Sequence, residues 1–262
     1  MECRLGLIQL AAGEDKAENL RAARAEIDRA VRDGAELVIL PEMFCLPYET
    51  ARFAEYAEAA GGPAQQMLAA AARENRCWLV GGSICEEENG RYYNTSYVYD
   101  PDGNLIAKHR KVHLFDIDIK GGQYFKESDV LSPGERLTVF DSPWGKIGLA
   151  ICFDIRFADM AAQMVDAGAR LLIYPASFNM STGPRHWELL FRARAMDGQC
   201  YSVGVAPARV EDASYVSWAH SIVVDPWAQV VCDLGTAAQT RVVSIDLDVV
   251  DAVRQQIPIG RA

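Results

Sequence analysis

The sequence predicts an α/β fold in which two β-sheets pack face to face and helices cover the outer sides. Strand-like and helix-like segments alternate along the 262 residues, which is typical of α/β proteins. The order of these segments in the first half recurs in the second half. Half of the residues are hydrophobic, enough for one large core, so we expect residues 1–262 to form a single domain.

The first half contains strands and helices in alternation, each with its own periodicity. Short apolar runs indicate buried strands, and apolar residues at helical spacing indicate amphipathic helices. Pro41 ends the second strand, because it cannot donate to a sheet. The expected strands cover residues 5–10, 36–40 and 78–84, and the expected helices cover residues 16–32 and 64–74.

A hairpin closes each half of the chain. Residues 93–99 and 105–111 flank the sequence Asp-Pro-Asp-Gly-Asn, which is a strong turn signal. A long irregular stretch follows at residues 113–136, rich in glycine, aspartate and aromatic residues. Such stretches in compact domains usually serve a function, so we expect this one to lie near a site.

Three matches in the same order relate the two halves. Residues 33–44 align with residues 167–178, and their Gly, Ala, Leu, Ile, Pro and Phe positions coincide. Upstream, Arg4-Leu-Gly-Leu resembles Lys146-Ile-Gly-Leu, and downstream both halves carry an Asp-Pro turn. We interpret this as two structurally related halves. Chance similarity between α/β segments is the alternative.

Composition limits the classes of partner. The net charge is −10 and there is no basic run, which argues against nucleic acid. No apolar stretch is long enough to span a membrane, and the N-terminus does not resemble a signal peptide. Seven scattered cysteines without a CxxC pair favour a reducing cytoplasm, and the four histidines have no metal-site spacing. We therefore expect no metal, and a small molecule or a second copy of the chain as partner.

Three reactive side chains lie at the ends of predicted elements. Cys152 ends an apolar run just before a helix pattern, where a helix N-terminus favours a thiolate. Glu42 follows the strand that Pro41 ends, and Lys111 follows the first hairpin. We expect the strands before Glu42 and Cys152 to be parallel neighbours in one sheet, so that their ends share a rim. Taken singly, each residue also has a structural interpretation, as a core thiol, a helix-cap carboxylate or a solvated charge.

These residues stand in motifs that resemble the nitrilase, or carbon–nitrogen hydrolase, superfamily. The motifs are Leu40-Pro-Glu42, His109-Arg-Lys111-Val-His-Leu and Gly148-Leu-Ala-Ile-Cys152-Phe-Asp-Ile-Arg156. The resemblance implies a four-layer α-β-β-α sandwich, no cofactor and a homodimer. It also implies Cys152 as nucleophile, Glu42 as general base, and Lys111 with the backbone N–H of Phe153 as oxyanion donors. By the same resemblance Glu127 positions Lys111, although a solvated loop charge is the alternative.

Stretches outside these motifs resemble the ω-amidases within the superfamily, among them His113-Leu-Phe-Asp-Ile-Asp118 and His186-Trp-Glu-Leu-Leu190. This implies hydrolysis of the terminal amide of 2-oxoglutaramate or 2-oxosuccinamate, so the substrate carries a carboxylate. Arg156, one helical turn beyond Cys152, is expected to grip that carboxylate, and Phe178 to line the pocket. Arg185 departs from the small residue expected before His186.

Other functions remain open at this stage. They are an amidase acting on deaminated glutathione, an N-carbamoyl amino-acid hydrolase, an inactive binding scaffold, and a redox sensor based on Cys152. The intact set of Glu42, Lys111 and Cys152 argues against the scaffold. No resolving cysteine is evident near Cys152, which argues against the sensor.

Overall fold

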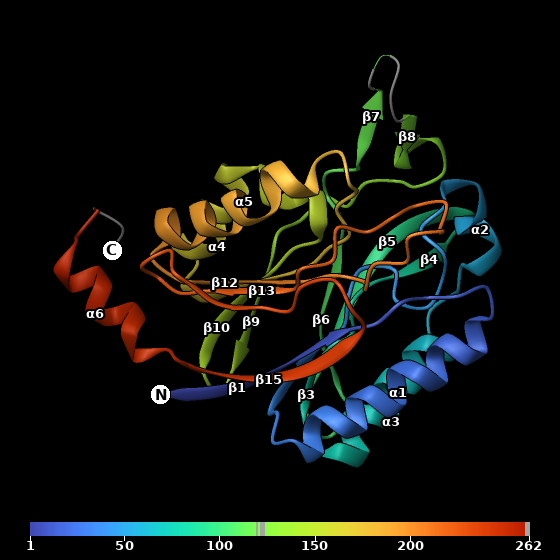
Figure 1. The fold of residues 1–262 in the computed structure, drawn as a ribbon. Helices are drawn as coiled ribbons and strands as arrows, with labels where there is room; N and C mark the ends of the chain where they lie inside the picture. Colours follow the sequence, from blue (N-terminus) through green and yellow to red (C-terminus); the bar gives the residue numbers. More distant parts are fainter. Residues whose placement is uncertain (119, 121–123, 260–262) are drawn as a thin grey trace.

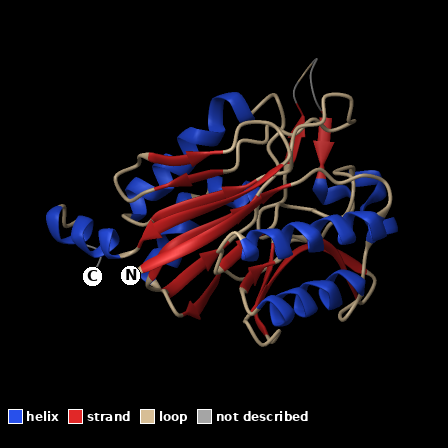
Figure 2. Ribbon diagram, turned by 60° about the horizontal axis from the view of Figure 1, so that its bottom comes forward, coloured by secondary structure: helices blue, strands red, loops and turns tan. Residues whose placement is uncertain are grey.

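The computed structural model describes residues 1–118, 120 and 124–259 and has four layers in the order α-β-β-α (Figures 1 and 2). Two large sheets face each other in the middle. Helices α1 (Lys16–Arg32) and α3 (Pro63–Asn75) cover one sheet, and α4 (Ala158–Asp166) and α5 (Gly183–Gly198) cover the other. The expected fold class is therefore confirmed.

The first sheet has the strand order β15-β1-β2-β3-β5-β4, with β6 paired to β5. Its strands are β1 (Glu2–Gln9), β2 (Leu37–Ile39), β3 (Trp78–Val80), β4 (Ile84–Glu88), β5 (Arg91–Tyr99), β6 (Leu105–Arg110) and β15 (Gln239–Asp246).

The second sheet has the order β14-β13-β12-β11-β10-β9. Its strands are β9 (Thr138–Ser142), β10 (Gly145–Leu149), β11 (Ala169–Pro175), β12 (Tyr201–Val205), β13 (Ile222–Val224) and β14 (Val230–Asp233).

Smaller elements complete the chain. The stretch predicted to be irregular carries a two-stranded hairpin and a short 3-10 helix. These elements are β7 (Asp116–Asp118), β8 (Tyr124–Lys126) and η2 (Glu127–Asp129). The others are η1 (Thr50–Arg52), α2 (Phe53–Tyr56), η3 (Cys152–Arg156) and α6 (Asp248–Gln256).

Apolar side chains fill the space between the two sheets. Leu5 and Ile39 of the first sheet are fully buried against Leu149 and Ile173 of the second sheet. Separate apolar clusters fill the spaces between each sheet and its own helices. Burial of these apolar side chains makes the largest favourable contribution to the stability of the folded sandwich.

The two halves pair their strands in the same order. In the first half β1, β2 and β3 are parallel neighbours, and β5 and β6 continue the sheet in antiparallel directions. In the second half β10, β11 and β12 are parallel neighbours, and β13 and β14 likewise continue the sheet in antiparallel directions. The predicted internal relationship is confirmed.

The expected single strand at residues 78–84 is wrong. The chain forms β3, bends at Gly81 and Gly82, and continues in the same direction as β4, which pairs with the preceding residues of β5. Gly82 has a φ of +58°, and a Cβ there would lie 2.1 Å from the carbonyl oxygen of Pro41. Only glycine fits this close approach, and it breaks an otherwise continuous apolar run.

The expectation that Glu42 and Cys152 follow neighbouring strands is also wrong. Glu42 follows β2 in the first sheet, whereas Cys152 follows β10 in the second sheet. Both strands belong to parallel sets, but these sets lie in opposite layers of the sandwich. The two side chains meet because corresponding strand ends of the two sheets lie at the same end of the sandwich (Figure 1).

Candidate active site

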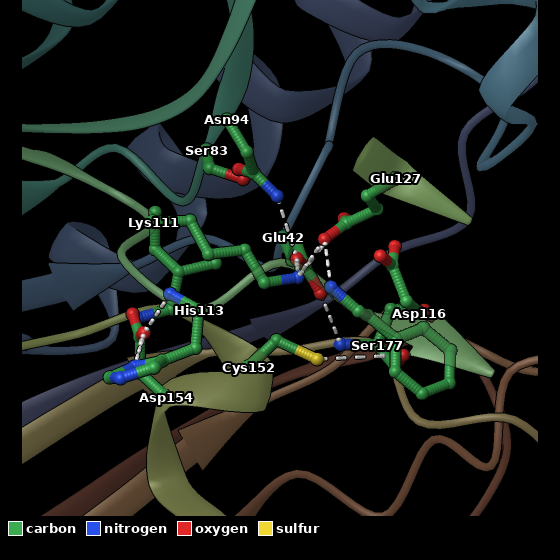
Figure 3. Close-up of polar contacts among 12 residues, drawn as sticks. Glu42, Ser83, Asn94, Lys111, His113, Asp116, Glu127, Cys152, Asp154 and Ser177 are labelled. Atoms are coloured by element: carbon green, nitrogen blue, oxygen red, sulfur yellow. Dashed lines mark hydrogen bonds and ion pairs between the residues drawn. The ribbon is translucent and has the colours of Figure 1, made fainter. Parts of the chain in front are cut away.

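A buried group of charged side chains lies between the two sheets, at the end of the sandwich where β2 and β10 end. Glu42, Lys111 and Glu127 have side chains with no exposed area, and Cys152 is 3 % exposed. Figure 3 shows the Cys152 sulfur pointing toward the carbonyl group of Ser177, with Glu42 and the ammonium group of Lys111 nearby. Charges are buried this completely only when they are paired and hydrogen-bonded.

Lys111 links the two carboxylates. Its Nζ lies 2.9 Å from Oε1 of Glu42 and 2.9 Å from Oε2 of Glu127. Lys111 immediately follows β6, and Glu127 begins η2, so the hairpin and the irregular stretch bring them together. The backbone N–H of Phe115 donates to the same Oε2 of Glu127 at 2.7 Å, which fixes that carboxylate.

Glu42 is held from three further directions. Asn94 on β5 donates from Nδ2 to Oε1 at 2.8 Å. The Tyr48 hydroxyl lies 3.2 Å from the same oxygen and 2.8 Å from Oε1 of Glu127. The backbone N–H of Ser177, just beyond β11 in the second sheet, donates to Oε2 at 2.8 Å. One carboxylate therefore joins the two halves of the molecule.

Burial and charge set the protonation states. Burial raises the pKa of Glu42, and the positive charge of Lys111 opposes this rise. Burial alone would lower the pKa of Lys111, but Glu127 and Glu42 raise it above its ordinary value, so the ammonium stays charged. The site thus holds one fixed cation and one carboxylate that gains a proton more readily than an ordinary glutamate, as a proton-transfer group requires.

Cys152 stands on an unusual backbone turn. It follows β10 as the first residue of η3 and has a φ of +45°. Its thiol donates to the carbonyl oxygen of Ser177 at 3.7 Å, and this carbonyl also accepts from the Tyr215 hydroxyl at 2.6 Å. Burial and the charge of Glu42 raise the pKa of the Cys152 thiol well above its ordinary value, so the free protein holds a thiol, not a thiolate.

A small cavity of about 10 Å³ lies over the thiol and is lined by Cys152, Arg156 and Phe178, among others. The guanidinium of Arg156 lies 5.3 Å from the ring centre of Phe153 and 5.0 Å from that of Phe178. Its Nη1 donates to Nδ1 of His186 at 3.1 Å, and its Nε has no hydrogen-bond partner. Among residues 1–118, 120 and 124–259, no carboxylate pairs with Arg156. A desolvated guanidinium without a counterion beside the thiol is suited to an anionic group.

The structure thus brings together all seven residues that the sequence singled out. Phe153 is the second residue of η3, where backbone N–H groups lack intrahelical acceptors. The departure at Arg185 lies in the first turn of α5, where its side chain is exposed and donates to the carbonyl oxygen of Ser181.

Four further residues of the site escaped sequence reasoning. Tyr48 and Asn94 contact Glu42, and Ser177 and Tyr215 frame the thiol. Asn94 lies on a strand whose polar residues look like an ordinary exposed face. Ser177 aligns with Met43 in the internal repeat, so the repeat was the one signal that could have placed it at the rim.

The described part of the chain contains no group of three or more His, Cys, Asp or Glu side chains arranged to hold a metal ion. In the same residues, no helix is long and apolar enough to cross a membrane.

Comparisons with known proteins identify the family of this chain. The family model described as "Carbon-nitrogen hydrolase" matches residues 4–255. The chain is 50 % identical over 256 residues to "Omega-amidase NIT2" of Mus musculus, covering 98 % of this chain and 93 % of that protein. It is 48 % identical over 258 residues to the Homo sapiens protein of the same name, covering 98 % and 94 %.

Solved structures show the same fold. The crystal structure of Saccharomyces cerevisiae Nit3, described as a member of branch 10 of the nitrilase superfamily, superimposes with a TM-score of 0.91. The two chains are 38 % identical, and the match covers 99 % of this chain and 95 % of that chain.

Proposed function

The chain belongs to the carbon–nitrogen hydrolase family, and on that premise we propose that it is an ω-amidase that hydrolyses the terminal amide of 2-oxoglutaramate or 2-oxosuccinamate. The observation that carries this proposal is the juxtaposition of a buried Cys152, Glu42 and Lys111 with the guanidinium of Arg156, which has no carboxylate partner among the described residues. The first three groups suit amide hydrolysis, and the fourth suits a substrate with a carboxylate.

The first half of the reaction forms a thioester. Glu42 takes the thiol proton as Cys152 attacks the carboxamide carbon, so no free thiolate is needed beforehand. The Lys111 ammonium and the backbone N–H of Phe153 stabilise the negative oxygen of the tetrahedral intermediate. Glu42 then returns its proton to the leaving nitrogen, and ammonia departs.

The second half hydrolyses that thioester. Glu42, again ionised, takes a proton from water, which attacks the acyl carbon and breaks the C–S bond. Glu42 returns this proton to the departing sulfur, so the 2-oxo dicarboxylate leaves and the thiol is restored. The raised pKa of Glu42 suits it to both proton transfers. Glu127 acts through Lys111. Its carboxylate forms an ion pair with the Lys111 ammonium at 2.9 Å and so keeps that ammonium in place within the site.

Arg156 and Phe178 decide which amides bind. A substrate carboxylate would serve as the counterion of Arg156. The rings of Phe153 and Phe178 contact the guanidinium and fix its orientation, so that two of its N–H groups can bind one carboxylate. Arg156→Ala is expected to raise KM for a 2-oxo dicarboxylate monoamide far more than it lowers kcat for a neutral amide. Equal losses on both substrates would remove Arg156 from this role.

The decisive experiment measures ammonia release from 2-oxoglutaramate, beside deaminated glutathione and an N-carbamoyl amino acid. Cys152→Ala is the control for background hydrolysis. Preferred, Cys152-dependent turnover of 2-oxoglutaramate supports the proposal. Preference for deaminated glutathione keeps the mechanism and changes the substrate, carbon dioxide release indicates a carbamoylase, and no turnover of any of them favours a binding scaffold.

We further propose a homodimer that works in the reducing cytoplasm. Leu189 and Met196, two turns apart on α5, are 65 % and 58 % exposed, which favours an apolar contact between copies. All seven cysteines are free, and six of them are buried, which suits a reducing compartment. Light scattering on Leu189→Glu should show a monomer if α5 forms the contact.

A further inference from the structure

We propose that Asp154 is a positioning residue that fixes the nucleophile turn against the strand end that carries Lys111. This inference rests on the proposed function, because it assigns a task within the same site. Asp154 lies two residues after Cys152 in η3 and is 1 % exposed. It touches neither the thiol nor the Lys111 ammonium, so its effect must pass through the backbone.

One oxygen of Asp154 holds the nucleophile turn. Oδ2 accepts from the backbone N–H of Ile151, the residue before Cys152, at 3.0 Å. The carboxylate thereby closes the turn that places Cys152 at a φ of +45°. A non-glycine residue keeps this conformation only where its surroundings enforce it.

The same carboxylate holds the segment around Lys111 from both sides. Oδ1 accepts from the backbone N–H and from Nδ1 of His113, both at 2.8 Å. Oδ2 lies 3.1 Å from Nε2 of His109. His109 and His113 stand two residues before and two residues after Lys111, so Asp154 fixes the chain on both sides of the lysine. Figure 3 shows the contact of Asp154 with His113.

Only a carboxylate can serve both sides at once. All four of these contacts present hydrogen atoms to Asp154, so both of its oxygens must accept. Burial opposes ionisation, but hydrogen bonds from His109 and His113 lower the pKa of Asp154 below its ordinary value, which keeps it ionised. An asparagine would point its NH₂ group at one set of donors and lose either the turn or the lysine segment.

Neighbouring side chains fix the two histidine rings that contact Asp154. The ring of His113 stacks on Phe157, with ring centres 3.4 Å apart and planes at 9°. Nδ1 of His109 lies 3.0 Å from the hydroxyl of Thr138 on β9, which fixes that ring as well. The network joins β6 of the first sheet to β9 and η3 of the second half, so it sets the distance across the seam at which the two catalytic groups meet.

The test compares Asp154→Asn with a matched variant, Asp233→Asn. Asp233 also pairs with a histidine, His220, at 3.0 Å, but it is exposed on β14. We expect Asp154→Asn to lower kcat by about 10²-fold with little change in KM, because small displacements of reacting groups cost about this much. The rate of Cys152 alkylation by iodoacetamide should fall as well, since the thiol loses its fixed place beside Lys111. Asp233→Asn should leave both rates at the wild-type value.

A second variant keeps the proposal testable if Asp154→Asn folds poorly. His113→Phe preserves the ring stack on Phe157 and the backbone N–H contact but removes the Nδ1 donor. We expect kcat to fall by about tenfold, and the effects of the two variants to be non-additive because they break one network.

The outcomes separate this inference from the proposed function. Folded Asp154→Asn with wild-type kcat and alkylation rate would overturn the positioning role while leaving the amidase intact. A loss explained entirely by the unfolded fraction, measured by urea titration, would overturn it too. If wild-type protein releases no ammonia from any of the three substrates, the proposed function fails, but slower alkylation in Asp154→Asn would still support the positioning role.

Discussion

The two halves of the molecule pair their strands alike but carry different side chains at matching strand ends. Pro41-Glu42-Met43 after β2 corresponds to Pro175-Ala176-Ser177 at β11. The backbone N–H of Met43 donates to the hydroxyl of Ser83 within its own half, whereas that of Ser177 donates to Glu42 across the seam.

The ends of the first strands differ in the same way. Leu10 follows β1 and packs in an apolar cluster, and its counterpart Cys152 turns into the left-handed region and reaches the site. The first half therefore supplies the two glutamates and the lysine, and the second half supplies the thiol. This comparison teaches that a repeated backbone produces one site, not two, when each half keeps only part of the chemistry.

The largest expected effect follows from removing the thiol of the second half. Cys152→Ala makes this strand end as unreactive as Leu10, and ammonia release should fall by at least about 10⁴-fold, because no other group can form the thioester. Cys232→Ala, a change at a partly exposed cysteine on β14, should retain full turnover. Residual turnover above one per cent in Cys152→Ala would show that a group other than the thiol of the second half can carry out the reaction.

The next effect concerns the carboxylate of the first half. The pKa of Glu42 is raised by burial, so its ionised form is lost at a higher pH than for an ordinary carboxyl group. Since the ionised form is the base, kcat/KM should fall as the pH is lowered through this raised value. A pH–rate profile measures the pH at which kcat/KM falls. Glu42→Gln should lower the rate by about 10²- to 10⁴-fold. An acid limb at or below pH 4.5, the ordinary value, would contradict the assignment.

Two equivalent glycines allow a comparison of packing. An added Cβ at Gly6 would lie 2.8 Å from Cβ of Ala35, and one at Gly148 would lie 2.6 Å from Cδ2 of Leu172. Both alanine variants should lose about 1–3 kcal/mol of unfolding free energy by overpacking. Gly6→Ala should lose more, because a Cβ cannot move without its backbone whereas the end of a leucine can rotate. Urea unfolding would measure the difference, and a larger loss for Gly148→Ala would reverse this interpretation.

The smallest effect is expected at the equivalent ends of α3 and α5. Arg76 and Gln199 both end their helices in the left-handed region, at φ values of 50° and 45°. Arg76→Gly should stabilise the protein by about 0.5–1 kcal/mol, because glycine adopts this conformation without strain. Gln199→Gly should gain less, since Nε2 of Gln199 donates to the carbonyl oxygen of Ile257. Equal gains in thermal unfolding would show that this contact contributes nothing.

The internal repeat and the motifs predicted much of this arrangement from the sequence. Strand ends are visible in a sequence because apolar runs stop there, and Glu42 and Cys152 each stand at the end of such a run, whereas Lys111 was located by the hairpin before it. The layer to which a strand belongs is not visible, because every buried parallel strand has the same apolar pattern. For that reason Glu42 and Cys152 were expected in one sheet and lie in two.

Contacts made by single side chains were the least predictable part. Tyr48 reaches Glu42 from a loop with no periodicity, and Asn94 does so from a strand with ordinary alternation. Asp154 stands within a recognised motif, yet its partners are distant in the sequence, 41 and 45 residues away. Such contacts depend on the packed fold, so local pattern carries no signal for them.

The backbone at Cys152 also limits which nucleophiles could ever replace it during evolution. A φ of +45° is tolerated by an unbranched side chain such as cysteine or serine, but a β-branched residue clashes with its own backbone there. Substitution by serine therefore leaves the turn accessible and changes only the reactivity of the attacking atom. Threonine, despite carrying the same hydroxyl group as serine, is excluded from this position by the shape of the chain.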